Sequence, residues 1–338
     1  MRKKHICIFV IILMLLGITW VPCFAQVKYA QTGFQFLSVI SDARASATGE
    51  AMTARDAGSS SLFFNPAGMA NMEGEKIDLT LSLNSWIADI RHSALSIAVS
   101  PFDGRYGVLG LALQYVDYGD IQGTMVWTNP EGFVDTEILK PSALCIGIGY
   151  AKMLNDRFSV GGQVKFVYQN LTKSVVPGIG TDNFFTKRNV ENGFAVDFGT
   201  LFKTGYKSLA FGMSVRNFSK EFEYEEEGFQ LPLLFTLGIS MNIMDFEFDF
   251  LDFGGLEHSL LVSVDATHPR SHREQVKVGL DYCIMNTLSL RGGYIANNDE
   301  DDISFGVGIK YMKVGMDYAY TPFGVLGTVQ RVTARISF

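Results

Sequence analysis

Apolar and polar residues alternate along most of the chain after residue 77. In QVKVGLDYCI, which begins at Gln275, Val276 and Val278 fall on one side and Lys277 and Gly279 on the other. The stretches IDLTLSLN, TLGISMNI and ISFGVGIKY repeat the scheme. A period of two, with one apolar face and one polar or glycine-rich face, is typical of a half-buried β-strand.

About fourteen such segments can be recognised by this alternation. They are predicted at 77–88, 92–100, 106–117, 142–151, 157–170, 191–202, 208–217, 233–243, 257–266, 274–284, 287–295, 302–311, 313–320 and 327–338. Most reach the roughly nine to eleven residues that a tilted strand needs to cross a membrane. The sequence therefore predicts an all-β protein, a transmembrane antiparallel β-barrel of about 14 strands that occupies residues 77–338.

The connections agree with this prediction, because short and long ones alternate as in barrels with periplasmic turns and outer loops. Residues 118–141, 171–190 and 218–232 are the long connections and are predicted to be outer loops. The connection 244–255 is an exception, since it is too long for a plain turn. It is expected to hold a strand extension or a periplasmic flap.

A soluble β-sandwich is the rival fold, but its strands rarely keep one polarity over so long a chain. The last segment, RVTARISF, places Val332, Ala334, Ile336 and Phe338 on one face. A final strand that ends in Phe resembles the C-terminal insertion signal of outer-membrane proteins. Phe338 is therefore the candidate for that signal, with the barrel-assembly machinery and outer-membrane lipid as expected partners and the cell outer membrane as the location.

The N-terminus has the three parts of a secretory signal peptide. Arg2 to Lys4 are basic, Ile6 to Val21 are apolar, and Cys23-Phe24-Ala25 offers a cleavage site, so residues 1–25 are predicted to be removed. A retained membrane helix and a lipoprotein at Cys23 are the alternatives. Loss of the three basic residues changes the formal net charge from −7 to −10, and an acidic exported chain argues against nucleic acid as a partner.

Nothing in the sequence marks a metal, a cofactor or an enzyme. Cys145 and Cys283 have no CxxC or zinc spacing. His268 and His272 have H-x3-H spacing, but Pro269 breaks the segment between them, so a helical metal site is not predicted. No Ser, His and acid are marked as a catalytic set. We expect no catalytic residue, no cofactor and no enzymatic activity.

With the apolar face outward, the barrel lumen receives charged residues of largely alternating sign, which are expensive to bury unless they pair. These are Lys165, Asp197, Arg216, Asp265, Lys277, Asp281, Arg291, Lys310, Asp317 and Arg335. Many glycines share this face and leave room for another segment to approach the wall. The lumen is either a water-filled pore or holds a plug.

Residues 26–76 are the candidate for that plug. Small residues such as Ala43 and Ala47 can pack closely, and Arg44 and Asp56 can meet lumen charges. The stretch SLFFNPAGMANM supplies its other candidate residues: Phe63, Phe64, Asn65, Pro66 and Gly68. Asn65 is expected to cap a helical turn that has Pro66 at its first position. An exposed periplasmic leader is the alternative.

This segment resembles the N-terminal signature of the PorV/PorQ family, which is related to the FadL-type fatty-acid transporter barrels. The matching residues are Ala43-Arg44, Gly49-Glu50-Ala51, Asp56 and Asn65-Pro66-Ala67-Gly68. The motif covers about thirty residues, and it departs from the family at Thr48-Gly49-Glu50, where the family more often has a second glycine. The resemblance implies a fourteen-stranded outer-membrane barrel whose N-terminal segment enters the lumen as a hatch.

Two functions follow from the resemblance. PorV-like members serve type IX secretion and hold secreted cargo proteins, whereas FadL-like members take up hydrophobic small molecules. We expect the secretion role, as a cargo-binding or shuttle component with cargo or other secretion components as partners. The predicted strands contain no internal proline that would break the wall for a lateral opening. Uptake of a hydrophobic small molecule is the second hypothesis, and a simple diffusion pore is the third.

Overall fold

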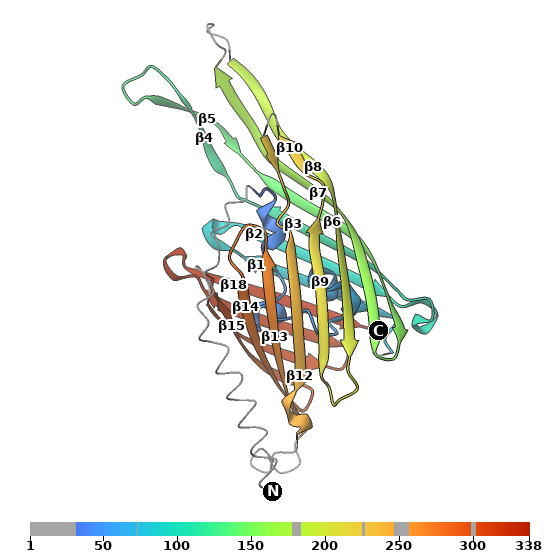
Figure 1. The fold of residues 1–338 in the computed structure, drawn as a ribbon. Helices are drawn as coiled ribbons and strands as arrows, with labels where there is room; N and C mark the ends of the chain where they lie inside the picture. Colours follow the sequence, from blue (N-terminus) through green and yellow to red (C-terminus); the bar gives the residue numbers. More distant parts are fainter. Residues whose placement is uncertain (1–31, 73, 178–183, 225–226, 247–256, 299–301) are drawn as a thin grey trace.

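The computed structural model describes residues 32–338 except 73, 178–183, 225–226, 247–256 and 299–301. The predicted signal peptide, residues 1–25, and most of the connection 244–255 lie outside the described residues. Within the described chain, fourteen antiparallel strands form one closed barrel (Figure 1). They are β1 Ile77–Ser85, β2 Arg91–Val99, β3 Val108–Asp117, β6 Ser142–Asn155, β7 Phe158–Pro177, β8 Phe184–Lys203, β9 Ala210–Phe218, β12 Leu234–Asn242, β13 His258–Pro269, β14 Gln275–Ile284, β15 Leu288–Ala296, β16 Ile303–Tyr311, β17 Val314–Pro322 and β18 Thr328–Ser337.

The remaining described elements are short. Two hairpins lie in connections: β4 Ile121–Val126 with β5 Phe133–Leu139, and β10 Phe222–Tyr224 with β11 Glu227–Phe229. The helical turns are η2 Gln35–Ser38, α2 Ala43–Ala47, η3 Gly58–Phe63, η4 Pro66–Met69, η5 Ile87–Asp89, η6 Pro101–Gly104, η7 Ile243–Asp245 and η9 Gly324–Leu326. No helix among the described residues is long and apolar enough to cross a membrane.

The predicted barrel is confirmed, and all fourteen predicted strands are present. β1 pairs with β2 on one side and with β18 on the other, which closes the ring. In β17, exposed and buried residues alternate strictly, with Met316 and Tyr318 outward and Asp317 inward. This is the pattern of a membrane barrel, in which the outer face meets lipid and the inner face is polar.

The barrel is much taller on one side than on the other. β7 and β8 each have 20 residues, and with the β4–β5 hairpin they rise beyond the other strands (Figure 1). The prediction that 171–190 is a loop was therefore wrong for most of this connection. Leu171 and Phe185 are both exposed in this extension, and neither side of it is a buried apolar face, so the alternation that identifies a barrel strand stops there.

The two ends of the barrel can be told apart by their connections. The short turns after β2, β6, β8, β14 and β16 lie at the same end as the start of β1 and the end of β18. Outer-membrane barrels have their short turns in the periplasm. The β4–β5 and β10–β11 hairpins and the tall extension of β7 and β8 are therefore at the outer end.

Candidate functional site

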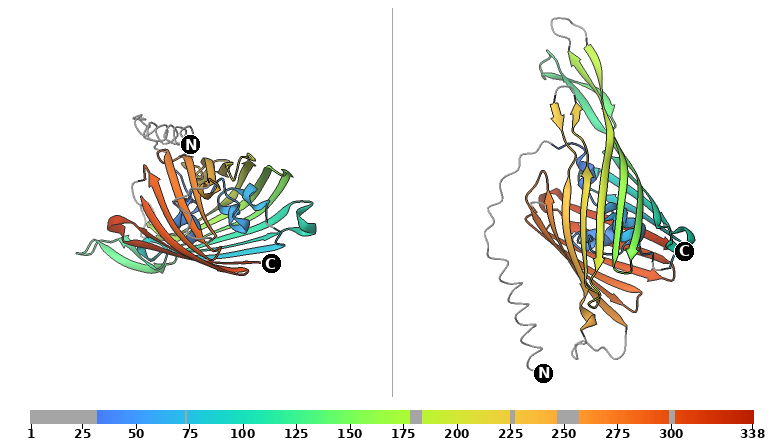
Figure 2. Two further views of the ribbon diagram at one scale, coloured as in Figure 1. Left: turned by 90° about the horizontal axis from the view of Figure 1, so that it is seen from below. Right: turned by 45° about the vertical axis from the view of Figure 1, so that its right-hand side comes forward.

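The lumen holds the chain's own N-terminal segment, residues 32–72. Figure 2 shows this segment, in blue, inside the ring of strands. It starts at the outer end, where Thr32 pairs with Gln230, and finishes at the periplasmic end before β1. On the way α2 lies against β15 to β18, Thr53 against β12 and β13, η3 against β1 to β3, and η4 against β6 to β8. The segment therefore contacts strands from all round the barrel.

Aromatic residues hold the outer end of the segment. The ring of Phe34 lies 5.5 Å from that of Phe222 in β10 and 6.0 Å from that of Phe229 in β11. Phe36 and Leu37 extend this buried apolar cluster toward the walls of β3 and β6 to β8. Burial of aromatic side chains contributes a large part of the stability of such contacts, so the β10–β11 hairpin and the segment stabilise one another.

Arg331 of β18 is a second contact point, which the sequence analysis did not single out. It is 1% exposed. Its Nε donates to the carbonyl oxygen of Ile40 at 2.9 Å, and its Nη1 donates to the hydroxyl groups of Ser46 at 2.6 Å and Thr321 at 2.9 Å. The guanidinium also lies 5.4 Å from the ring of Trp86. Its inward position in the strand was the available signal, because a buried guanidinium requires several acceptors.

The Asn-Pro motif occupies the periplasmic half of the lumen. Asn65 caps η4 by accepting from the amide of Ala67 at 3.1 Å, and Pro66 is at the first position of that turn. The Asn65 amide donates to the carbonyl oxygens of Thr53 at 2.7 Å and Thr200 at 2.9 Å. One side chain thus caps a turn, ties two parts of the segment together and joins them to β8.

The other plug candidates are also inside the lumen. Phe64 is 4% exposed and Phe63 is half-buried, and the carbonyl oxygen of Phe63 accepts a hydrogen bond from Arg216 of β9. A side chain at Gly68 would come within 2.5 Å of the carbonyl oxygen of Arg55. Asp56 lies at the periplasmic end, where its carboxylate contacts Lys203 at 2.5 Å.

Glycines in the wall mark the places where the segment comes closest. A Cβ at Gly161 would lie 2.5 Å from the backbone of Pro66 and Ala67, and one at Gly279 would lie 2.4 Å from the carbonyl oxygen of Thr48. A Cβ atom essentially never lies this close to a heavy atom to which it is not bonded, so these positions cannot carry a side chain without moving the segment. The same crowding against the segment is found at Gly110, Gly149, Gly199, Gly212, Gly238, Gly293 and Gly306.

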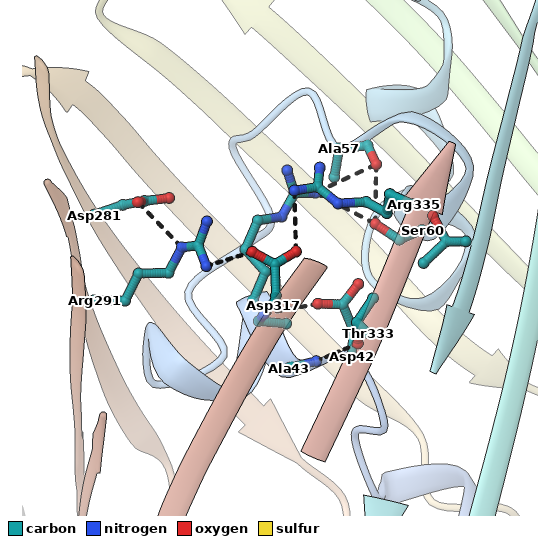
Figure 3. Close-up of polar contacts among 12 residues, drawn as sticks. Asp42, Ala43, Ala57, Ser60, Asp281, Arg291, Asp317, Thr333 and Arg335 are labelled. Atoms are coloured by element: carbon teal, nitrogen blue, oxygen red, sulfur yellow. Dashed lines mark hydrogen bonds and ion pairs between the residues drawn. The ribbon is translucent and has the colours of Figure 1, made fainter. Parts of the chain in front are cut away.

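The inward charges form pairs within the wall. Asp317 contacts Arg291 at 2.7 Å and Arg335 at 3.1 Å (Figure 3). Arg291 also contacts Asp281 at 3.1 Å. These pairs link β14 to β18 across the inside of the barrel. Lys165 and Asp197 form a further pair at 2.8 Å.

Other inward charges contact the segment. Lys277 meets Glu50 at 2.6 Å, Asp281 meets Arg55 at 2.7 Å, and Asp265 accepts from the amide of Thr53 at 3.0 Å. The sequence prediction also placed Lys310 among the charges that face the lumen. This placement was wrong, because Lys310 is exposed near the periplasmic end of β16.

Arg44 lies in α2, between the rest of the segment and the wall strands β15 to β18. Its Nη2 donates to the carbonyl oxygen of Ala57 at 3.3 Å. Burial, and next the neighbouring Arg335, lower the pKa of Arg44 to about 9. Arg44 is therefore still a cation at neutral pH, held mainly by oxygen acceptors of the segment.

Acid should weaken one contact between the segment and the wall. Burial raises the pKa of Glu50, but Lys277, followed by Arg331 and Arg216, lowers it more, so the pKa lies below the ordinary 4.5. A carboxylate with a lowered folded-state pKa stabilises the fold above its unfolded pKa and loses this contribution as the pH falls through the folded value. We expect protease protection of residues 32–72 to be constant from pH 7 to 4.5 and to fall only below that range. Glu50→Gln should flatten this acid response, and a loss of protection between pH 7 and 5 would contradict the assignment.

Above the segment is a vestibule, a cavity of about 750 Å³ at the outer end of the barrel. Its floor includes Ser38, Ile40 and Glu50 of the segment. Its sides come from the outer ends of strands and from connections, including Trp86 and Phe323. The volume is within the range of ordinary ligand sites. In the part of the chain that is described, no group of three or more His, Cys, Asp or Glu is placed to hold a metal ion.

The fold and the filled lumen define the class of protein: an outer-membrane β-barrel with its own N-terminal segment inside. The model of the family "Type IX secretion system protein PorV" matches residues 24–252, more than half of the chain, so the chain belongs to the PorV family. No curated protein matches it in sequence.

Several solved structures share the barrel fold. The toluene transporter TodX of Pseudomonas putida has a TM-score of 0.55 and 13% identity, with 92% of this chain and 99% of TodX covered. The toluene transporter TbuX of Ralstonia pickettii has a TM-score of 0.53 and 14% identity, with 87% of this chain and 96% of TbuX covered. A FadL homologue of Pseudomonas aeruginosa has a TM-score of 0.53 and 14% identity, with 93% of this chain and 100% of the homologue covered. At these identities the likeness shows the fold alone. The family and these neighbours are secretion or transport barrels.

Proposed function

We propose that this protein is a non-enzymatic component of type IX secretion that binds secreted cargo proteins at its outer face. Membership of the PorV family is the observation that carries the proposal. The barrel strands and the lumen pairs serve to hold a binding surface in place, and no covalent chemistry is assigned to any residue.

The tall side of the barrel supports the proposal. The β4–β5 hairpin projects with Val126 89% exposed, and Trp127 and Phe133 are exposed beside it. Phe185, on the extension of β8, is 62% exposed. Exposed aromatic residues are enriched where proteins bind one another. The vestibule opens at the same, outer end of the barrel, and its described lining comes from the segment, from β9 and β12 to β15, and from connections rather than from the tall side.

We assign residues 26–76 as the plug and 77–338 as the barrel, with 1–25 as the signal peptide and Phe338 as the insertion signal. A 14-stranded barrel without its segment would be nearly as wide as the 16–18-stranded porins, which leave an aqueous channel. The burial of Phe64 and the contacts of Asn65 support the assignment of the segment as a closure of that channel. In this assignment the segment prevents small solutes from passing through the barrel while the outer face binds cargo.

Uptake of hydrophobic small molecules is the second candidate function. An apolar pocket of about 420 Å³ lies at the outer rim, between the extension of β7 and β8 and the β10–β11 hairpin. Leu171, Phe34 and Phe229 line it. The pairing of β7 with β8 shifts next to this pocket, between Asn170 and Lys173. A bulge of this kind locally disrupts the wall of a barrel.

A pull-down with the purified barrel tests the proposed function. We expect it to recover secreted proteins that share one C-terminal domain, and to lose them when residues 121–139 are replaced by a short Gly-Ser linker. Phe102→Ser, which alters an exposed aromatic residue at the periplasmic end, is the matched control and should leave capture unchanged. Recovery of fatty acid or other lipid without protein would instead favour the uptake function.

A further inference from the structure

The vestibule has an uneven distribution of charge. Among the described residues that line it, the cationic ones are Arg216, Arg273 and Lys277, and Glu50 is the one carboxylate. Glu50 is already engaged by Lys277 at 2.6 Å. Two guanidinium groups therefore remain in excess over the carboxylates of this lining, and exposed His272, the sequence neighbour of Arg273, lines the same cavity.

Arg216 has donors to spare. One of its terminal nitrogens donates to the carbonyl oxygen of Phe63, while its buried Nε has no hydrogen-bond partner among the described residues. A guanidinium carries five N–H donors, and a buried donor without an acceptor costs free energy. The nearby carboxylate of Asp197 contacts the ammonium group of Lys165 at 2.8 Å and accepts a hydrogen bond from the backbone amide of Asn217 at 2.7 Å.

The remaining carboxylate near the floor, that of Asp265, is engaged through one of its two oxygens. Its Oδ2 accepts a hydrogen bond from the backbone amide of Thr53 at 3.0 Å, whereas its buried Oδ1 has no hydrogen-bond partner among the described residues. Arg273 lies higher, in the exposed connection between β13 and β14. The vestibule thus has the cation of Arg273 at its rim, and in its floor the cation of Arg216, whose hydrogen-bond donors are only partly used.

We infer that the vestibule binds carboxylate groups of an acidic peptide segment, with Arg216 and Arg273 as the residues that receive them. This inference rests on the proposed function, in which the outer face binds a protein. Arg pairs with carboxylates in bidentate geometry, so two such residues give orientation as well as affinity. Trp86, Leu233 and Phe323 offer apolar contacts for the neighbouring side chains of the same segment. The carboxylates come from a chain terminus or from Asp and Glu side chains.

Fluorescence anisotropy of the whole barrel in detergent tests this site with three labelled probes. Amidated hexaglutamate carries side-chain carboxylates only, hexaserine with a free C-terminus carries one terminal carboxylate, and hexalysine is the opposite charge. We expect the first or the second to bind and hexalysine not to bind. Binding of hexaglutamate alone identifies side chains as the source, and binding of hexaserine alone identifies the chain terminus. Absence of both, or equal binding of hexalysine, overturns the inference.

Two variants locate the binding. Arg273→Gln and Arg216→Gln should each weaken the binding probe about tenfold or more, as expected for loss of a charge-assisted hydrogen bond. Arg273→Lys should restore part of the loss. Lys310→Gln, which removes an exposed cation near the periplasmic end of β16 and outside the vestibule, is the control and should change nothing. Because Arg216 also contacts the segment, Arg273 decides the case if Arg216→Gln fails to fold.

The proposed function and this inference can fail separately. Capture of secreted proteins that is unchanged by Arg216→Gln and Arg273→Gln leaves the proposed function standing and overturns the carboxylate site. Loss of capture in both variants, with capture intact in Lys310→Gln, supports the site. A barrel that captures no secreted protein but still binds hexaglutamate contradicts the proposed function and leaves the carboxylate chemistry of the vestibule in place.

Discussion

Gly293→Val should raise the single-channel conductance of the barrel severalfold in a planar bilayer. A Cβ at this position would lie 1.9 Å from the amide nitrogen of Gly49 and 2.6 Å from its Cα. Both atoms belong to the backbone of the N-terminal segment, so the segment must move away from β15. Displacing it opens the lumen of a barrel that is otherwise wide enough to conduct.

The neighbouring Gly292→Val is the matched control, because no atom lies within 4 Å of the Cβ it would add. The two variants add the same side chain to the same strand, one toward the segment and one toward lipid. Equal conductance of Gly293→Val and the parent protein would contradict the assignment of the segment as the closure of the lumen.

Asp317→Ala should destabilise the barrel by about 3–5 kcal/mol, the typical cost of removing one partner from a buried ion pair. The Asp317 side chain is 2% exposed, and it contacts both Arg291 and Arg335. Its loss leaves Arg291 with Asp281 alone and Arg335 without its contact to this carboxylate. The change is measured as a shift of the urea midpoint for unfolding from lipid vesicles.

Lys313→Ala supplies the comparison for this stability measurement. Lys313 contacts Glu75 at 3.2 Å at the periplasmic end, with side chains 55% and 34% exposed. Exposed pairs contribute roughly 0–1 kcal/mol, so this variant should unfold close to the parent protein. Similar midpoints for Asp317→Ala and Lys313→Ala would show that the charge pairs of the lumen are not a main source of stability.

Most of the barrel could be predicted from the sequence, because each strand meets lipid on one face and polar groups on the other. That contrast ends where a strand leaves the membrane, which is why the extension of β7 beyond Asn170 and the start of β8 at Phe184 were missed. The β4–β5 hairpin, whose residues are mostly exposed, was missed for the same reason.

The residues of the wall and of the segment that form the site could be predicted from the sequence, but the contacts between them could not. Gly161 and Gly279 could be recognised as inward glycines, and the segment was the available partner for them. Which glycine meets which residue depends on how the segment turns inside the lumen, and strand alternation carries no information about that path. Arg331 was missed because its acceptors, such as Ile40 and Ser46, lie nearly three hundred residues away in sequence.

The contacts of β18 bear on how the protein assembles. The hydroxyl oxygen of Thr333 in this last strand accepts a hydrogen bond from the backbone amide of Ala43 at 2.8 Å. β18 also pairs with β1, which closes the ring. The position of β18 therefore affects both the closure of the ring and the packing of the segment. Contacts between the first and last parts of a chain form slowly, because a long loop must be closed before they are made. Closing the ring and packing the segment against β18 consequently both depend on contacts between the first and last parts of the chain, and both are expected late in assembly.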